Sequence, residues 1–102
     1  MFVAMNRFKI VDGQGEAFER IWRERDSHLD GVPGFVRFAL LRADGGDYIS
    51  HSTWASRAAF EAWTQSPAFG AAHGSTSLMG ILAGPPQISL YDAVLEKDAA
   101  TS

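Results

Sequence analysis

The sequence predicts an α+β domain with the ferredoxin-like order β-α-β-β-α-β, in which helices cover one face of an antiparallel sheet. Apolar residues alternate with a period of two in four segments and recur at helical spacing in two others. The Asp-Gly-Gly-Asp run at 44–47 is a strong hairpin signal between two of the strands. The expected elements are strands at 2–11, 35–43, 48–54 and 87–95, a helix at 16–29, and a helix that begins after Ser56 and restarts at Ser66 and Pro67.

The opening strand carries one residue that does not suit its face. The face that the helices are expected to cover holds Phe2, Ala4, Asn6, Phe8 and Ile10. Asn6 is the polar exception, and a buried amide without a partner costs about 1–3 kcal/mol. Asn6 is therefore either a structural amide bonded to neighbouring backbone or a functional group.

Composition narrows the class of protein. The chain has 102 residues, a formal net charge of −3 and no cysteine. We expect one domain over residues 1–95 and a flexible tail at 96–102. The absence of a basic run argues against nucleic acid, and no segment has the roughly 20 apolar residues of a membrane helix. The N-terminus does not resemble a signal peptide, so we expect a cytoplasmic protein without a membrane partner.

The second helical region contains two further candidate residues. Trp63 follows Phe60 at helical spacing, and His73 lies four residues after Phe69, on the same face of a helix. Trp63 taken alone is best explained as core filler, and His73 as a cation favoured by a helix C-terminus. The other two histidines have no comparable context.

Asn6 and the segment 53–73 together resemble the haem-degrading monooxygenases of the antibiotic-biosynthesis-monooxygenase superfamily. The pattern W-x-S-x-x-A-F-x-x-W-x-x-S-x-x-F-x-x-A-H is matched throughout, from Trp54 to His73. The resemblance spans residues 1–95, and the combination of Asn6, Trp63 and His73 is its specific part.

The resemblance implies a fold, a cofactor and roles for these residues. Two chains would pack their sheets into a dimeric α+β barrel, and each chain would keep its own haem site. His73 would be the axial ligand of the iron, Asn6 a hydrogen-bond donor on the distal side, Trp63 a bulky wall, and Phe69 a further haem contact. Haem would be both cofactor and substrate, opened with O2 and an external electron donor, and its iron would be released for use by the cell.

Three alternatives stay open. A cofactor-independent monooxygenase could oxidise a small aromatic such as a quinol in the same cavity. A haem carrier would bind haem without degrading it, and a stress-response barrel would carry no chemistry. Arg20, Arg23 and Arg25 are candidates for binding the haem propionates, although solvated surface charges are the simpler interpretation.

Overall fold

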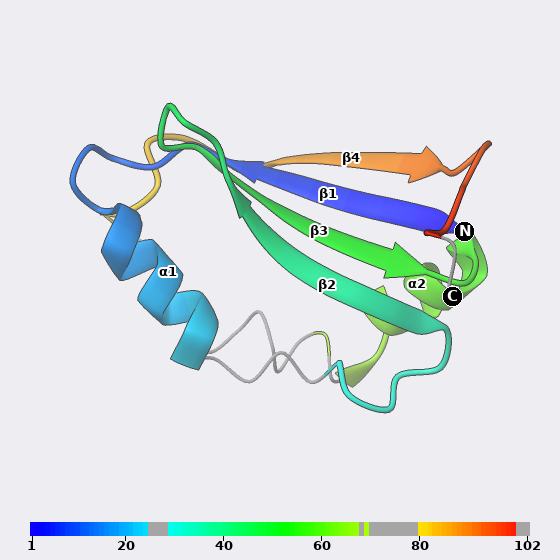
Figure 1. The fold of residues 1–102 in the computed structure, drawn as a ribbon. Coiled ribbons are helices and arrows are strands. Elements are labelled where there is room, and N and C mark those ends of the chain that lie inside the picture. Colours follow the sequence, from blue (N-terminus) through cyan, green and yellow to red (C-terminus); the bar gives the residue numbers. More distant parts are fainter. Residues whose placement is uncertain (25–28, 68, 70–79, 100–102) are drawn as a thin grey trace.

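The computed structural model describes residues 1–24, 29–67, 69 and 80–99 of the chain (Figure 1). Its elements in chain order are β1 (Phe2–Phe8), α1 (Gly15–Glu24), β2 (Phe35–Arg42), β3 (Tyr48–Trp54), α2 (Arg57–Thr64) and β4 (Gln87–Asp92). The four strands form one antiparallel sheet in the order β2-β3-β1-β4. This arrangement confirms the predicted ferredoxin-like fold.

Two predicted strands end earlier than the alternation of apolar residues suggests. β1 ends at Phe8, and Ile10 forms only an isolated bridge with Leu82. β4 ends at Asp92, not at residue 95. Asp92 pairs with Phe2 at the start of β1, and beyond it the described residues make only one backbone hydrogen bond, from the Ala93 N–H to the Met1 carbonyl, at 2.9 Å. Alternation reports which side chains share a face, but a strand also needs a neighbour.

The first helix does not extend to Leu29 as predicted. α1 covers Gly15–Glu24 of the described residues, and Leu29 is not helical. The N–H of Val32 donates to the carbonyl of Leu29 at 3.1 Å, which makes a turn where the periodicity suggested the last helical residue. Residues 25–28 of the predicted helix lie outside the described part.

The turns and caps agree with the sequence signals. The hairpin between β2 and β3 closes with Ala43 donating to the carbonyl of Asp47 at 2.8 Å. Ser56 caps α2, since its hydroxyl accepts from the N–H of Ala59 at 3.1 Å. The same contact recurs ten residues later, where the Ser66 hydroxyl accepts from the N–H of Phe69 at 3.3 Å and confirms the predicted helix restart.

The hydrophobic core divides into two clusters, one toward each end of the sheet. The first joins the start of β1 and the end of β3 to α2, and its members are Phe2, Ala4, Leu29, Trp54 and Phe60. The second joins α1 to the opposite end of the same strands through Phe8, Phe18 and Tyr48. The middle of the helix-facing side of the sheet is left between the two clusters.

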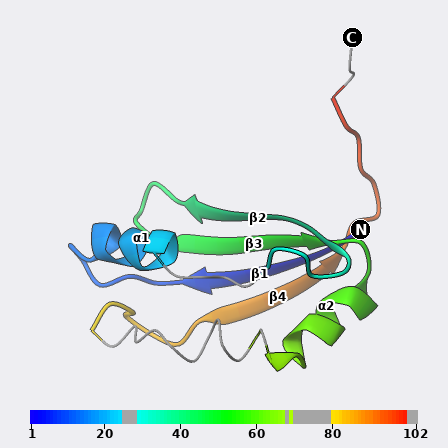
Figure 2. The same ribbon diagram turned by 90° about the horizontal axis from the view of Figure 1, so that it is seen from below.

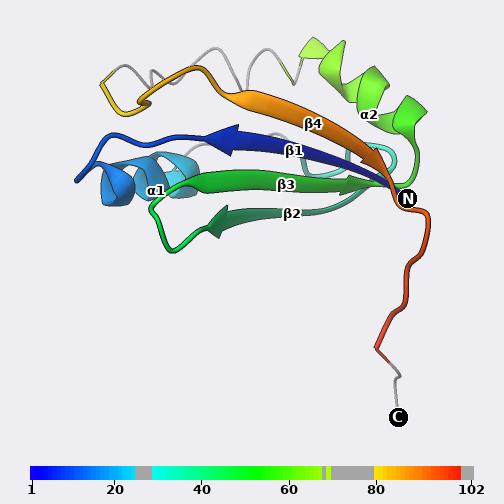
Figure 3. The same cartoon turned by 90° about the horizontal axis from the view of Figure 1, so that it is seen from above.

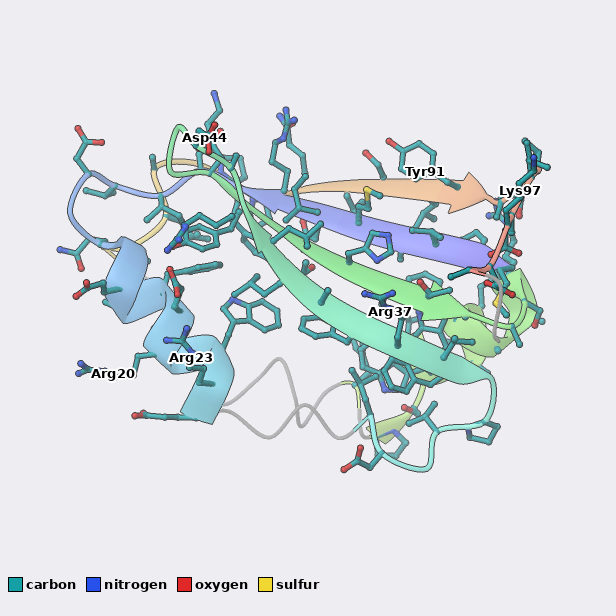
Figure 4. All side chains as sticks on the ribbon, in the orientation of Figure 1. Arg20, Arg23, Arg37, Asp44, Tyr91 and Lys97 are labelled. Atoms are coloured by element: carbon teal, nitrogen blue, oxygen red, sulfur yellow. The ribbon has the colours of Figure 1, made fainter. Side chains whose placement is uncertain are left out.

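The opposite face of the sheet has no helix of the described residues packed on it. α2 lies on one side of the sheet, and the residues after β4 leave on the other (Figures 2 and 3). Register places Arg37 and Tyr91 on this second face, over the strands in Figure 4. Leu41, also on this face, is 45% exposed. Within the described ranges, no helix has the length and apolar character needed to cross a membrane.

Candidate functional site

A cavity of about 180 Å³ lies on the helix-facing side of the sheet, between the two core clusters. Its wall is mostly apolar and aromatic. The sheet contributes Ala4, Met5, Asn6, Phe38, Ser50, Ser52 and Ile88, and the helical side contributes Trp22, Leu29, Phe60, Trp63, Thr64 and Phe69. An apolar cavity with a few polar groups on one wall is the usual form of a small-molecule site.

Asn6 lies in the middle of β1 and lines this cavity. Its register partners are Ser50 on β3 and Ile88 on β4. The Oδ1 atom of Asn6 is buried and accepts no hydrogen bond from the described residues. Nearby backbone therefore does not satisfy this oxygen, and a catalytic or binding role is one of the explanations for such a buried group.

Trp63 reaches the cavity from the last turn of α2. Its ring packs on Trp54 at a centroid distance of 5.3 Å and meets Phe69 nearly at right angles at 4.9 Å. Trp63 is thus partly core filler, as its spacing suggested, and partly cavity wall. Asn6, Trp63 and Phe69 are brought together around one cavity.

The predicted iron ligand, His73, lies outside the described residues, as does His28. His51 is paired with Met5 and Ala39 on the face of the sheet that α2 does not cover. Among the described residues, no group of three or more histidine, cysteine, aspartate or glutamate side chains could hold a metal ion. A haem iron needs only one imidazole from the protein, so the search for such clusters does not test the haem site.

Sequence reasoning missed several residues of the cavity wall. Ser50, Ser52 and Phe38 enter it because β2 and β3 lie next to β1 in the sheet. The alternation within 48–54 was a usable signal, since it puts Tyr48, the two serines and Trp54 on one face. The sequence alone does not predict the strand register, which places Ser50 opposite Asn6.

A second, wider cavity of about 590 Å³ lies between α1 and β2. It shares Trp22 and Phe38 with the first cavity. These two rings are stacked, with centroids 5.5 Å apart and planes 20° from parallel. The stacked pair therefore lines both cavities.

Charged groups at the second cavity fasten α1 to the sheet. Glu19 accepts from the Tyr48 hydroxyl and, at 3.0 Å each, from Arg23 and Arg42. The Tyr48 hydroxyl, followed by the two guanidinium groups, lowers the pKa of Glu19 below its usual value. Burial, with the adjacent Glu19 carboxylate, raises the pKa of Tyr48. This cluster holds the helix that carries Trp22.

The three arginines that were candidates for propionate binding do not form one cluster among the described residues. Arg23 pairs with Glu19 at the edge of the second cavity, and the labelled Arg20 extends from α1 away from the sheet (Figure 4). Arg25 lies outside the described residues.

The fold and the cavity define a class of protein, a ferredoxin-like α+β domain that encloses an apolar ligand site between its sheet and its helices. Comparison with known families gives a match to the antibiotic biosynthesis monooxygenases over residues 1–75. The chain belongs to the antibiotic biosynthesis monooxygenase family.

Two curated relatives cover most of the chain. A mycobilin-producing heme oxygenase of Mycobacterium tuberculosis is 34% identical over 74 residues, which are 71% of this chain and 70% of that protein. A heme-degrading monooxygenase of Bacillus thuringiensis is 32% identical over 100 residues, covering 90% of this chain and 89% of that protein.

Solved structures show the same fold. The heme-degrader MhuD of M. tuberculosis, with two hemes bound in its active site, has a TM-score of 0.79 at 29% identity and covers 96% of this chain and 100% of its own. The cofactor-independent oxygenase SnoaB of Streptomyces nogalater has a TM-score of 0.71 at 24% identity, with 93% of this chain and 94% of that chain covered. At that identity SnoaB supports the fold alone.

Proposed function

We propose that the chain is a haem-degrading monooxygenase. It opens the haem macrocycle oxidatively with O2 and electrons from an external donor, and it releases the iron. The relatives at 32% and 34% identity, whose names give this activity, support the proposal. The observation that carries it is the unsatisfied Asn6 amide oxygen on the sheet wall of an aromatic cavity that Trp63 also lines.

The chemical character of the cavity wall suits a porphyrin. A flat apolar macrocycle is matched by aromatic walls, and the Asn6 amide offers a polar group on the sheet side. The volume of about 180 Å³ is below the usual 300–1,000 Å³ of ligand pockets, so a macrocycle needs adjoining space. The second cavity of about 590 Å³, which shares Trp22 and Phe38 with the first, would supply such space on movement of these two rings.

The proposed roles divide between binding and orientation. His73 would hold the iron through a neutral imidazole nitrogen, and haem when bound would supply the site at which O2 is activated. The Asn6 Nδ2 donates a hydrogen bond from the sheet side, and an amide N–H orients a partner without giving up its proton. Trp63 would be a bulky wall against the macrocycle, and Phe69 packs against Trp63 nearly at right angles.

One experiment tests this proposal directly. Purified protein is titrated with haem, then given ascorbate in air, and the absorbance spectrum is followed together with capture of released iron by a ferrous chelator. We expect a Soret band on titration, followed by its loss with release of iron. A Soret band that persists under ascorbate and air would instead identify a haem carrier.

The small volume of the first cavity favours one alternative. A cofactor-independent monooxygenase of quinol-sized aromatics fits about 180 Å³ without any movement of Trp22. This alternative predicts no Soret band on haem titration and consumption of O2 with a quinol alone. The same titration therefore separates the two activities.

We also propose a homodimer formed through the sheet face that α2 does not cover. The exposed apolar side chains on this face include Leu41 and Tyr91, and Val94 just beyond β4 is 96% exposed. Leu41 and Tyr91 lie on the two edge strands of the sheet, and burying this face would add to the small core. Sedimentation velocity should give twice the chain mass of 11.1 kDa, and a Tyr91→Arg variant should sediment as a monomer.

We propose a cytoplasmic domain over residues 1–95, with 96–102 as its tail.

A further inference from the structure

Asn6 and Ser50 lie directly opposite each other on two neighbouring strands. They are register partners in the β1–β3 pairing, and both line the cavity of about 180 Å³. Directly opposite residues on one face have Cβ atoms about 4.5–5.5 Å apart, within reach of one another's side chains. On its other side Asn6 is paired with Ile88, which has no hydrogen-bonding group. Ser50 is therefore the polar neighbour of Asn6 across the sheet.

The hydroxyl groups of the two cavity serines differ in what they bind. Ser52 accepts from the indole N–H of Trp54 at 3.0 Å and donates to the carbonyl of Ala4 at 3.4 Å. The Ser50 hydroxyl has no hydrogen bond with any described residue. Asn6 Oδ1 is a buried acceptor without a donor, and the Ser50 hydroxyl is a donor without an acceptor, one strand away.

We propose that Ser50 is a positioning residue for Asn6. When substrate fills the cavity, the Ser50 hydroxyl turns about χ1 and donates to Asn6 Oδ1. That bond fixes the orientation of the amide, so that Nδ2 points into the cavity as a donor. Without it the amide can flip and present its oxygen, which repels an electron-rich partner. This inference rests on the proposed function, because Ser50 would act by orienting the Asn6 amide that donates to the bound ligand.

A matched pair of variants isolates the hydroxyl. Ser50→Thr keeps a hydroxyl and Ser50→Val replaces it with a methyl group of similar size, and both β-branched residues suit a strand. The full-length variants are loaded with haem, reduced and exposed to carbon monoxide. The stretching frequency of bound carbon monoxide reports a nearby donor, because a donated hydrogen bond lowers it. We expect Ser50→Thr to match the original protein and Ser50→Val to shift upward, in the direction given by Asn6→Ala.

Turnover and affinity complete the measurement. Ser50→Val should degrade haem about 2- to 10-fold more slowly, the loss expected for one neutral hydrogen bond, with unchanged haem affinity. In an Asn6→Ala background, Ser50→Val should cause no additional shift or slowing, because the residue acts through Asn6.

Each outcome has a definite meaning. Equal carbon monoxide frequencies in Ser50→Thr and Ser50→Val, with haem bound to both, would overturn the role of Ser50 alone. An effect of Ser50→Val that persists in the Asn6→Ala background would also overturn it, since the hydroxyl would then act directly on the ligand or the fold. Failure of the unmodified protein to bind haem would overturn the proposed function, and the role of Ser50 with it.

Discussion

Gly34 and Ala59 touch where the chain enters β2 and passes α2: a Cβ atom on Gly34 would lie 2.4 Å from the Cβ of Ala59. Gly34 also has a φ of +81°, and its carbonyl accepts from the N–H of Ala55 at 2.7 Å. The close approach holds α2 near the sheet, and α2 carries Trp63 into the cavity. Glycine is therefore required here for two separate reasons, its backbone conformation and the space at its α-carbon.

Gly34→Ala should be strongly destabilising, and Gly31→Ala is its control. Gly31 has a similar φ of +78°, but a Cβ there would meet nothing within 4 Å. We expect Gly31→Ala to cost about 1 kcal/mol for its φ alone and Gly34→Ala a further 1–3 kcal/mol for the contact. Each kcal/mol lowers the Tm of a domain of this size by about 4–8 °C. Equal melting temperatures for the two variants would show that the contact with Ala59 costs nothing.

Asn6→Val should make the protein more stable and the enzyme slower. The change removes a buried oxygen without a partner and places a β-branched residue in a central strand. We expect the free energy of unfolding in urea to rise by about 1 kcal/mol and haem turnover to fall about tenfold or more, with haem still bound. A variant that is less stable, yet degrades haem at the original rate, would show that Asn6 serves only the fold.

His73→Ala should abolish tight haem binding, and His51→Ala should not. His51 lies on the face of the sheet opposite the cavity, so it controls for the loss of an imidazole as such. Losing the proposed iron ligand should raise the haem Kd by at least about 100-fold, as measured by Soret titration. If His73→Ala retained the original affinity, the ligand would have to be sought elsewhere.

Trp63→Phe should bind haem with a flatter ring. The smaller side chain keeps an aromatic contact with Trp54 but withdraws part of the wall of the cavity. Macrocycle distortion is one means by which a protein tunes haem iron, and the out-of-plane modes in resonance Raman spectra measure it. We expect these modes to weaken in the variant. Unchanged modes would leave Trp63 with a packing role only.

The Glu19 cluster should make stability depend on pH in the acid range. The pKa of Glu19 is lowered from its usual 4.5, chiefly by the Tyr48 hydroxyl. Its contribution to stability is therefore complete above about pH 4.5 and is lost as the pH falls through the lowered pKa. Glu19→Gln should have a lower urea midpoint than the original protein at pH 7, and the difference should shrink at pH 3. A difference independent of pH would assign the effect to packing.

Much of the fold follows from the sequence because its signals are local. Ser56 and Ser66 indicate helix starts, and Asp-Gly-Gly-Asp indicates a hairpin. The alternation in 2–8 puts Asn6 on the helix-facing side of the sheet. Where a strand stops is a different matter. β4 ends at Asp92 because its neighbour β1 begins at Phe2, and a segment read alone does not contain that information.

The cavity followed from the sequence only in part. Asn6, Trp63 and Phe69 were expected at one site and line one cavity. Ser50 and Trp22 were not expected, because their place depends on strand register and on the packing of α1 against Phe38. The predictions for His73 and Arg25 concern residues outside the described part of the chain.

Asn6 and Ser50, two of the polar residues of the sheet wall, lie on inner strands. β1, with Asn6, is hydrogen-bonded to β3 and β4, and β3, with Ser50, to β1 and β2. Backbone amides on such strands exchange with deuterium most slowly, whereas α1 meets the sheet through side chains such as Phe18 and Trp22. If the cavity takes up haem as proposed, we expect the helical side to move and the strands to stay in place. The backbone of the strand wall should therefore keep one shape, while side chains on it such as Ser50 and Phe38 adjust.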